Sequence, residues 1–219
     1  MAGGYPGGPI DWVKVAGDAA SLVRPESRAK YFPRNPLRRL LIENFLSRLG
    51  LIVAGRPGKK ILDLGCGEGF VDYYLTLHFP DRMITGVDPD PAALQAARKI
   101  NPSLDYFEAD ARRLAFPDRA FDLVLCLEVL EHLDDYPQVM AEARRVSAGP
   151  CVFSVPAWPW YQATNFLIGK NWARLGEHPD HVVRFTKKRL GLDLEKVFGP
   201  PVELIFSYPW LIGLAGRKK

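Results

Sequence analysis

Three glycines alternate with other residues directly after a short apolar run, at Gly65, Gly67 and Gly69. Glycine lets a ligand approach the backbone closely, and the first amides of a following helix lack backbone partners. Asp88 follows about 20 residues later, at the end of the next apolar run. A carboxylate in that place can accept hydrogen bonds from two ribose hydroxyls. The spacing therefore predicts a site for a ligand that contains a nucleoside.

The details of this segment disfavour two common nucleotides. A dinucleotide-binding fingerprint would place its third glycine at position 70, where Phe70 stands. A phosphate-binding loop ends in Gly-Lys-Ser/Thr, whereas Gly58 is followed by Lys59 and Lys60. We therefore expect neither NAD nor ATP.

Alternating strands and helices would hold this site. We expect strands over 60–64, 83–87, 104–108, 121–127 and 151–155, and helices over 35–50, 70–79, 90–98, 136–146 and 186–199. Near-continuous apolar strands between amphipathic helices are typical of a parallel sheet that is covered on both faces. Two further strands, 202–207 and 210–214, have Pro209 between them and predict a terminal antiparallel hairpin.

Length and composition favour one enzyme-sized domain. The chain has 219 residues, 47% hydrophobic and 25% charged. We expect a flexible segment over 1–34 and a domain over 35–219, with an aromatic-rich insertion at 156–185 where helical periodicity fails. The uncharged stretch 146–169 contains several prolines, so we expect no membrane-spanning helix.

Charge and cysteine content bear on partners and location. The formal net charge is +4, which is too small to predict a nucleic-acid partner. The three cysteines, Cys66, Cys126 and Cys151, lie in or beside apolar runs and are interpreted as reduced interior residues. We therefore expect a cytoplasmic protein.

Four segments together resemble a known family, the class I S-adenosylmethionine-dependent methyltransferases. They are Asp63 to Gly69, Gly86 to Asp90, Asp110-Ala111 and Phe121 to Leu133. The resemblance covers about residues 35–155 and is strongest to the small-molecule branch that includes ubiquinone and menaquinone methylases. It implies a Rossmann-like α/β fold with a seven-stranded, mostly parallel sheet, helices on both faces and an antiparallel C-terminal hairpin. It also implies an enzyme that transfers a methyl group from S-adenosyl-L-methionine to a small acceptor.

The resemblance also implies roles for individual residues. The cofactor-binding residues would be Asp63, Gly65, Cys66, Gly67, Gly69, Asp88, Pro89, Asp110, Ala111, Leu127 and Glu128. The glycine segment would pack against the methionine moiety and ribose, and Asp88 would hold the ribose hydroxyls. Asp110 would accept from the adenine amino group, with Ala111 nearby, and Leu127 and Glu128 would border the sulfonium. Two alternatives stay open, because Asp63 could only cap the turn and Asp110 could be an ordinary loop acid.

Methyl transfer from a sulfonium mainly requires alignment of the acceptor, and a hydroxyl acceptor also requires a base. His132 is the candidate catalytic residue, because it follows the fourth strand by a few residues. The alternative is that Glu131 and His132 form an orienting or packing pair. His178 and His181 are close in sequence, but no second ligand cluster accompanies them, so we expect no metal site.

The insertion 156–185 is the candidate for acceptor choice, because aromatic residues crowd it. These side chains would suit a lipophilic acceptor or peripheral contact with a membrane surface, or they could simply cover the core. Two other functions remain open, an RNA or protein methyltransferase and a noncatalytic protein that binds the same cofactor. The Asn-Pro-Pro-aromatic motif that marks methylation of a base amino group is absent after the fourth strand.

Overall fold

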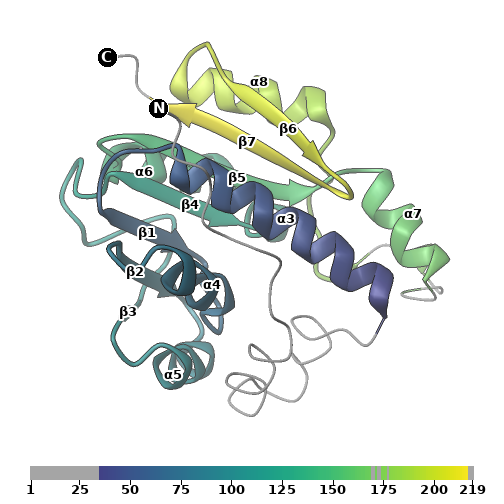
Figure 1. The fold of residues 1–219 in the computed structure, drawn as a ribbon. Coiled ribbons are helices and arrows are strands. Elements are labelled where there is room, and N and C mark those ends of the chain that lie inside the picture. The colour runs from purple at the N-terminus through teal and green to yellow at the C-terminus, as the bar shows by residue number, and fades with distance from the viewer. Residues whose placement is uncertain (1–34, 169–170, 172–173, 177, 217–219) are drawn as a thin grey trace. The chain divides into compact units, whose positions relative to one another are not determined.

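The computed structural model describes residues 35–168, 171, 174–176 and 178–216 (Figure 1). Its backbone divides into two compact units, one up to Ala109 and one from Asp110. The expected flexible segment 1–34 lies outside the described residues, and the single domain over 35–219 stays a prediction.

Three helices and three parallel strands make up the described part of the first unit. They are α3 (Pro36–Ala54), β1 (Lys60–Leu64), α4 (Phe70–His78), β2 (Met83–Asp88), α5 (Pro91–Ile100) and β3 (Asp105–Glu108). Strand β2 lies between the other two, and Gly86 pairs with Asp63 on one side and with Tyr106 on the other. This register brings the ends of β1 and β2 together, so that the glycine segment after β1 lies beside Asp88, the last residue of β2.

The helix boundaries in this unit follow local chemistry. The Asn35 side chain caps α3 by accepting from the backbone N–H groups of Leu37 and Arg38. Asp90 caps α5 in the same manner, by accepting from Ala92. One boundary is wrong: α3 does not end at Gly50 but continues to Ala54. Gly50 is buried in the helix, and helix packing overrides its weak intrinsic propensity there.

The second unit holds the other four strands. Its elements are β4 (Leu123–Leu127), the 3₁₀ turn η1 (Leu130–His132), α6 (Tyr136–Val146), β5 (Pro150–Pro156), α7 (Trp160–Leu167), α8 (Lys187–Phe198), β6 (Glu203–Ser207) and β7 (Trp210–Gly216). Strands β4 and β5 are parallel, whereas β7 runs antiparallel to both β5 and β6. The predicted C-terminal hairpin is therefore confirmed.

Helices α6 and α8 pack against each other, and α8 covers β6 and β7 (Figure 1). Thr186 caps α8 by accepting from the backbone N–H of Arg189. The insertion 156–185 differs from its description in the sequence analysis, because it contains helix α7. Several of its large apolar side chains are exposed, including Trp160, Phe166 and Leu167. The helix has only eight residues and no side-chain cap, so few sequence signals mark it.

The strand order is β3-β2-β1-β4-β5-β7-β6. This is a seven-stranded, mostly parallel sheet with an antiparallel C-terminal pair, as predicted. The strands β4 and β5 are buried along nearly their whole length, as expected for strands covered on both faces.

Candidate functional site

The loop between β1 and α4 requires its three glycines. Gly65, Gly67 and Gly69 have φ angles of 74°, 54° and 71°, a region that residues with a side chain rarely adopt. The backbone N–H groups of Gly65 and Cys66 both donate to the carbonyl of Val87, at 2.8 and 3.1 Å. The loop is thus attached to the end of β2, next to Asp88.

Asp88 bonds to the glycine loop through its side chain. Its Oδ2 accepts from the backbone N–H of Gly67 at 2.9 Å, and its Oδ1 accepts from that of Asp90 at the same distance. Each carboxylate oxygen has about two lone-pair sites, so each can accept a further hydrogen bond. Asp88 is half-buried and Pro89 beside it is exposed. The carboxylate is therefore fixed in place and still able to accept from a pair of hydroxyls.

These features of the first unit fit an adenosyl ligand. The glycine loop leaves its backbone unobstructed, Asp88 offers acceptors suited to ribose hydroxyls, and no side chain caps the N-terminus of α4. The amides of a helix's first turn are the donors that the polar end of a ligand uses. Gly65, Gly67, Gly69 and Asp88 are therefore brought together as the sequence analysis expected.

Asp63 lies behind this loop. Its side chain is 2% exposed and forms a hydrogen bond with the carboxyl group of Asp72, which is fully buried. Burial, and then the charge of Asp72, raise the pKa of Asp63 well above its usual value. Cys66 is also buried, which raises the pKa of its thiol. This position favours a role for Asp63 in supporting the loop from behind. Sequence reasoning missed Asp72, although an acid within the apolar segment of α4 was the available signal.

In the second unit, the Asp110 carboxylate is paired with Arg112. The Arg112 guanidinium donates to both oxygens, with its Nη2 2.6 Å from Oδ2. These hydrogen bonds lower the pKa of Asp110, which is exposed next to the half-buried Ala111. Asp110 could therefore accept a hydrogen bond from an adenine amino group only through carboxylate lone pairs that do not already bond to Arg112. The sequence analysis did not identify this partner.

Glu128 follows β4 with a φ angle of 58°, so the chain turns sharply where that strand ends. Its Oε1 accepts from the Ser154 hydroxyl at 3.0 Å, and its Oε2 accepts from the indole N–H of Trp210 at 2.8 Å. Leu127 just before it is 9% exposed. The carboxylate of Glu128 is thus held by β5 and β7, partners that lie far away in the sequence.

Three histidines gather beside η1. The His132 ring lies 5.1 Å from that of His181 and 6.3 Å from that of His178, between centroids, and His178 and His181 are stacked. The Nδ1 of His132 lies 3.0 Å from the carbonyl oxygen of Asp180. Because a carbonyl only accepts, Nδ1 carries the proton, and Nε2 of a neutral His132 keeps its lone pair.

This cluster could hold a divalent cation. One ligand atom from each of Glu131, His132 and His181 lies within 4.8 Å of the other two. Burial, and then the charges of His132 and His178, lower the pKa of His181 to about 4, so its imidazole is neutral at pH 7 and can act as a ligand. Neutral imidazoles with a carboxylate are a common donor set for transition-metal ions. The sequence analysis did not bring His132 and His181 together, because the two histidine segments meet only in the fold.

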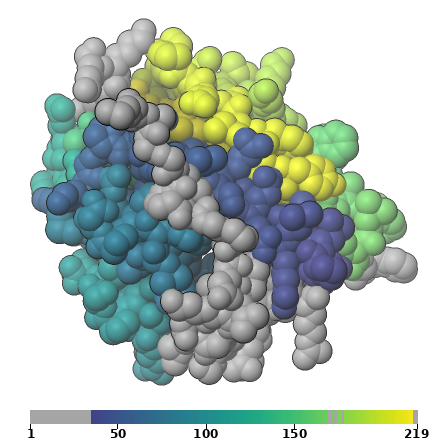
Figure 2. Space-filling view, in the orientation of Figure 1, coloured from purple at the N-terminus to yellow at the C-terminus, as the bar shows by residue number. Residues whose placement is uncertain are grey.

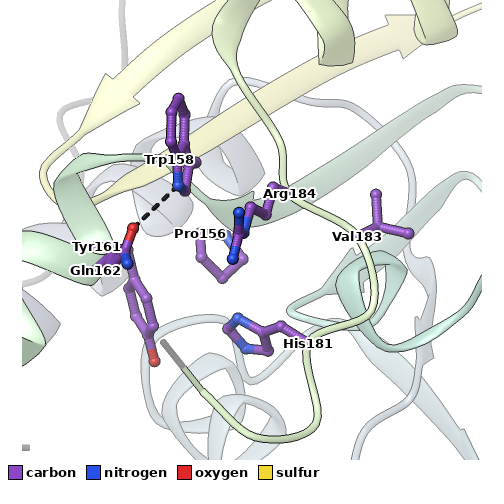
Figure 3. A pocket seen from close by; sticks show the side chains of 7 residues that line it. All are labelled: Pro156, Trp158, Tyr161, Gln162, His181, Val183 and Arg184. Atoms are coloured by element: carbon purple, nitrogen blue, oxygen red, sulfur yellow. Dashed lines mark hydrogen bonds between the residues drawn. The ribbon is translucent and has the colours of Figure 1, made fainter. Parts of the chain in front are cut away.

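A small pocket adjoins the histidines within the second unit (Figure 3). Its empty space is about 240 Å³ including the part open to solvent, and it is lined by Pro156, Trp158, Tyr161, Gln162, His181, Val183 and Arg184. The indole N–H of Trp158 donates to the Gln162 side chain at 3.0 Å, which orients one wall. All seven residues come from the insertion 156–185, the segment predicted to select the acceptor.

Comparison with known proteins identifies the domain. Residues 62–150 match a family model described as a methyltransferase domain. The chain is 36% identical over 107 residues to a ubiquinone biosynthesis O-methyltransferase of Pseudomonas aeruginosa, covering 46% of this chain and 45% of that protein. It is 34% identical over 91 residues to a phthiotriol/phenolphthiotriol dimycocerosates methyltransferase of Mycobacterium leprae, covering 41% and 34%. The chain thus spans less than half the length of these curated relatives.

The fold has solved counterparts as well. The magnesium protoporphyrin IX methyltransferase of Synechocystis PCC 6803 aligns with a TM-score of 0.64 at 16% identity, covering 94% of this chain and 98% of that one. Sequence motifs, family match and sheet topology agree with one another. Residues 62–150 are therefore similar to a methyltransferase domain, in agreement with the resemblance that the sequence motifs carry.

Proposed function

We propose that this protein transfers a methyl group from S-adenosylmethionine to a small lipophilic acceptor. The observation that carries the proposal is the bond between Asp88 and Gly67, which joins the acid and the glycine loop within a methyltransferase domain. The names of two relatives, in ubiquinone biosynthesis and phthiotriol dimycocerosate methylation, support a lipophilic acceptor.

In the first unit, Asp88 would accept from the ribose hydroxyls while the glycine loop packs against the rest of the ligand. When bound, the cofactor supplies an already activated methyl group on a sulfonium. The task left to the chain is to align the acceptor and exclude water, so no nucleophilic side chain is required. Asp110, Ala111, Leu127 and Glu128 remain candidate cofactor contacts, with Asp110 and Glu128 acting from within their own hydrogen-bond networks.

In the second unit, the pocket lined by Trp158 and Tyr161 would receive the acceptor, because aromatic walls suit an apolar molecule. A hydroxyl acceptor must lose a proton. His132 Nε2, whose lone pair is fixed by the bond from Nδ1 to Asp180, would take it as general base. A cation held by Glu131, His132 and His181 would instead lower the pKa of the hydroxyl.

The exposed apolar side chains around α7 support peripheral contact with a membrane, where such an acceptor would reside. Helix α7 and the β6–β7 hairpin both reach the surface (Figure 2), and Leu167 is 80% exposed. Among the described residues, no helix has the length and apolar character needed to cross a bilayer. The three free, buried cysteines are consistent with a reducing, cytoplasmic setting.

Two measurements test the proposal. S-adenosylhomocysteine should raise the melting temperature, and Asp88→Ala should abolish the shift while Asp105→Asn, an exposed acid of the same unit, retains it. Labelled cofactor should then mark quinols or lipophilic phenols. Labelling of tRNA or protein instead would show that the acceptor is a macromolecule and not a small lipophilic molecule. An unchanged melting temperature at millimolar ligand would contradict the proposed methyltransferase function.

A further inference from the structure

Four polar side chains are buried together behind the glycine loop of the first unit. Asp63, Asp72, Asn101 and Tyr106 are 2%, 0%, 4% and 5% exposed, respectively. Buried polar groups are costly unless they are hydrogen-bonded, and a buried charge is costlier still. Two acids in one such cluster therefore require an explanation.

Three of these side chains form a directed chain of hydrogen bonds that ends on the loop. The amide of Asn101 donates to the Gly69 carbonyl and to the Tyr106 hydroxyl oxygen, both at 2.9 Å. The Tyr106 hydroxyl in turn donates to Asp72 Oδ2, also at 2.9 Å. Gly69 has no room for a side chain here, because a Cβ would lie 2.7 Å from that hydroxyl. The last residue of the glycine loop is thus held through Asn101 and Tyr106 by a carboxyl on α4.

The second carboxylate oxygen of Asp72 indicates that one of the two buried acids is protonated. Asp72 Oδ1 is buried and receives no hydrogen bond from an N–H group or hydroxyl of the described residues. Besides Tyr106, the group that forms a side-chain hydrogen bond with Asp72 is the carboxyl of Asp63. Two ionised carboxylates only accept, so a hydrogen bond between them exists only when one carries a proton.

The surroundings favour keeping that proton. Asp88 is the other charged group that acts on Asp63, and its negative charge opposes ionisation. Cys66 and Tyr106 also interact with the pair, and burial raises the pKa of both, so they stay neutral. Burial raises the pKa of Asp72 to about 6 and that of Asp63 well above its usual value.

We propose that Asp72 is a positioning residue of the glycine loop, which shares one proton with Asp63 and fixes the Gly69 carbonyl through Tyr106 and Asn101. The proposal rests on the proposed function only in that this loop binds the cofactor. When the shared proton is lost at high pH, two negative charges face each other in a buried place. The loop then loses its anchor, so cofactor affinity falls as the pH rises through the titration of the pair.

Asp72→Asn is the decisive variant, because its amide can donate to the Asp63 carboxylate and its carbonyl can still accept from Tyr106. The hydrogen bonds and the single negative charge are then kept without a shared proton. Titration with S-adenosylhomocysteine from pH 6 to pH 9.5 should show a weakening on the order of tenfold for the unaltered protein, which equals one pKa unit of difference between free and bound forms. Asp72→Asn should bind as tightly at pH 6 and show a flat profile.

Asp72→Leu removes the acceptor of Tyr106 and should weaken binding at every pH, whereas Asp81→Asn, an exposed acid of the same unit, should keep both affinity and slope. A pH slope that persists in Asp72→Asn would overturn the proposal. So would unaltered affinity in Asp72→Leu.

A readout without ligand separates this proposal from the proposed function. The free protein at pH 7 should show an infrared carbonyl band of a protonated carboxylic acid, and Asp72→Asn should lack it. Amide hydrogen exchange near Gly69 should be faster in Asp72→Leu than in Asp72→Asn. If the ligand fails to bind any variant, the cofactor assignment falls, while the band and the exchange rates still decide whether Asp72 positions the loop.

Discussion

The Asp88 carboxylate lies 2.9 Å from the backbone nitrogen of Gly67, so one side chain both ends β2 and holds the glycine loop. A second bond, to the backbone of Asp90, fixes the other oxygen. The carboxylate is therefore oriented before any ligand arrives, which lowers the entropy cost of binding.

Asp88→Asn should weaken S-adenosylhomocysteine binding. A hydrogen bond to a charged group contributes about 1.5–3 kcal/mol, and asparagine also loses the charge, so we expect the Kd to rise roughly 10- to 150-fold. Isothermal titration calorimetry measures this change. Asp105→Asn, at the exposed start of β3, serves as the matched control and should leave the Kd unaltered. An equally unaltered Kd for Asp88→Asn would contradict the role given to this acid.

Gly86 is a packing constraint beneath the same site. A Cβ there would lie 2.5 Å from Tyr106 Cε1 and 2.8 Å from Cys66 Sγ. Gly86→Ala should therefore lower the free energy of unfolding by about 1–3 kcal/mol, because the packed neighbours must shift. Gly55→Ala is the control, since its nearest neighbour would be 3.4 Å away. If urea denaturation gave both variants the same free energy of unfolding, the core would accommodate the extra methyl group without loss of stability, which would contradict this prediction.

Much of this fold could be predicted because its signals are local. The caps by Asn35, Asp90 and Thr186 follow from residue type at a helix start, and the apolar strands follow from composition. Helix α7 escaped prediction because it has only eight residues and no side chain caps its start. The predicted end of α3 at Gly50 was wrong because tertiary packing, which the sequence does not show, extends the helix beyond this residue.

The site divides in the same manner. The glycine loop and Asp88 lie at the ends of strands that the apolar pattern predicts. Their proximity in the fold could therefore be predicted from the sequence. Asp72 depends on Tyr106, which lies 34 residues further along the chain, and His132 depends on the backbone of Asp180, 48 residues away. Such hydrogen-bond partners depend on how helices and strands pack against one another, and a single sequence does not show this packing.

The histidine cluster should bind a divalent cation. Manganese or zinc ions added to the protein should raise its melting temperature, and His181→Ala should reduce this shift by removing one of the three ligands. His78→Ala, on α4 of the first unit, provides a control that retains the shift. Equal metal responses of the two variants would assign the cation to another place on the chain.

His181 should also make stability depend on pH. Its pKa of about 4 in the folded protein is below the usual 6.5, so below pH 6.5 the unfolded chain takes up the proton first. The contribution of this residue is therefore present above pH 6.5 and is lost as the pH falls toward 4. Urea denaturation over this range should give a difference between the original protein and His181→Gln that shrinks on acidification. A difference that is constant with pH would contradict a neutral, buried His181.

The pocket wall offers the sharpest test of acceptor choice. Tyr161 lines the pocket and lies between His181 and Trp210, with ring centroids 5.7 and 6.3 Å away. Tyr161→Ala should raise the KM for a lipophilic phenol about tenfold. Loss of an aromatic contact surface costs about 1.5–3 kcal/mol of binding free energy, and water that enters the vacated space offsets part of this loss. Cofactor Kd should stay unaltered, since Tyr161 is not among the candidate cofactor contacts.

Trp160→Ala is the matched control, because Trp160 is on the same helix and 54% exposed but does not line the pocket. Steady-state kinetics with both variants separate the pocket from the apolar surface around it. A raised KM for Trp160→Ala alone would mean that the exposed face of α7, and with it the membrane contact, governs how the acceptor is delivered. A raised KM for Tyr161→Ala alone assigns acceptor recognition to the pocket itself.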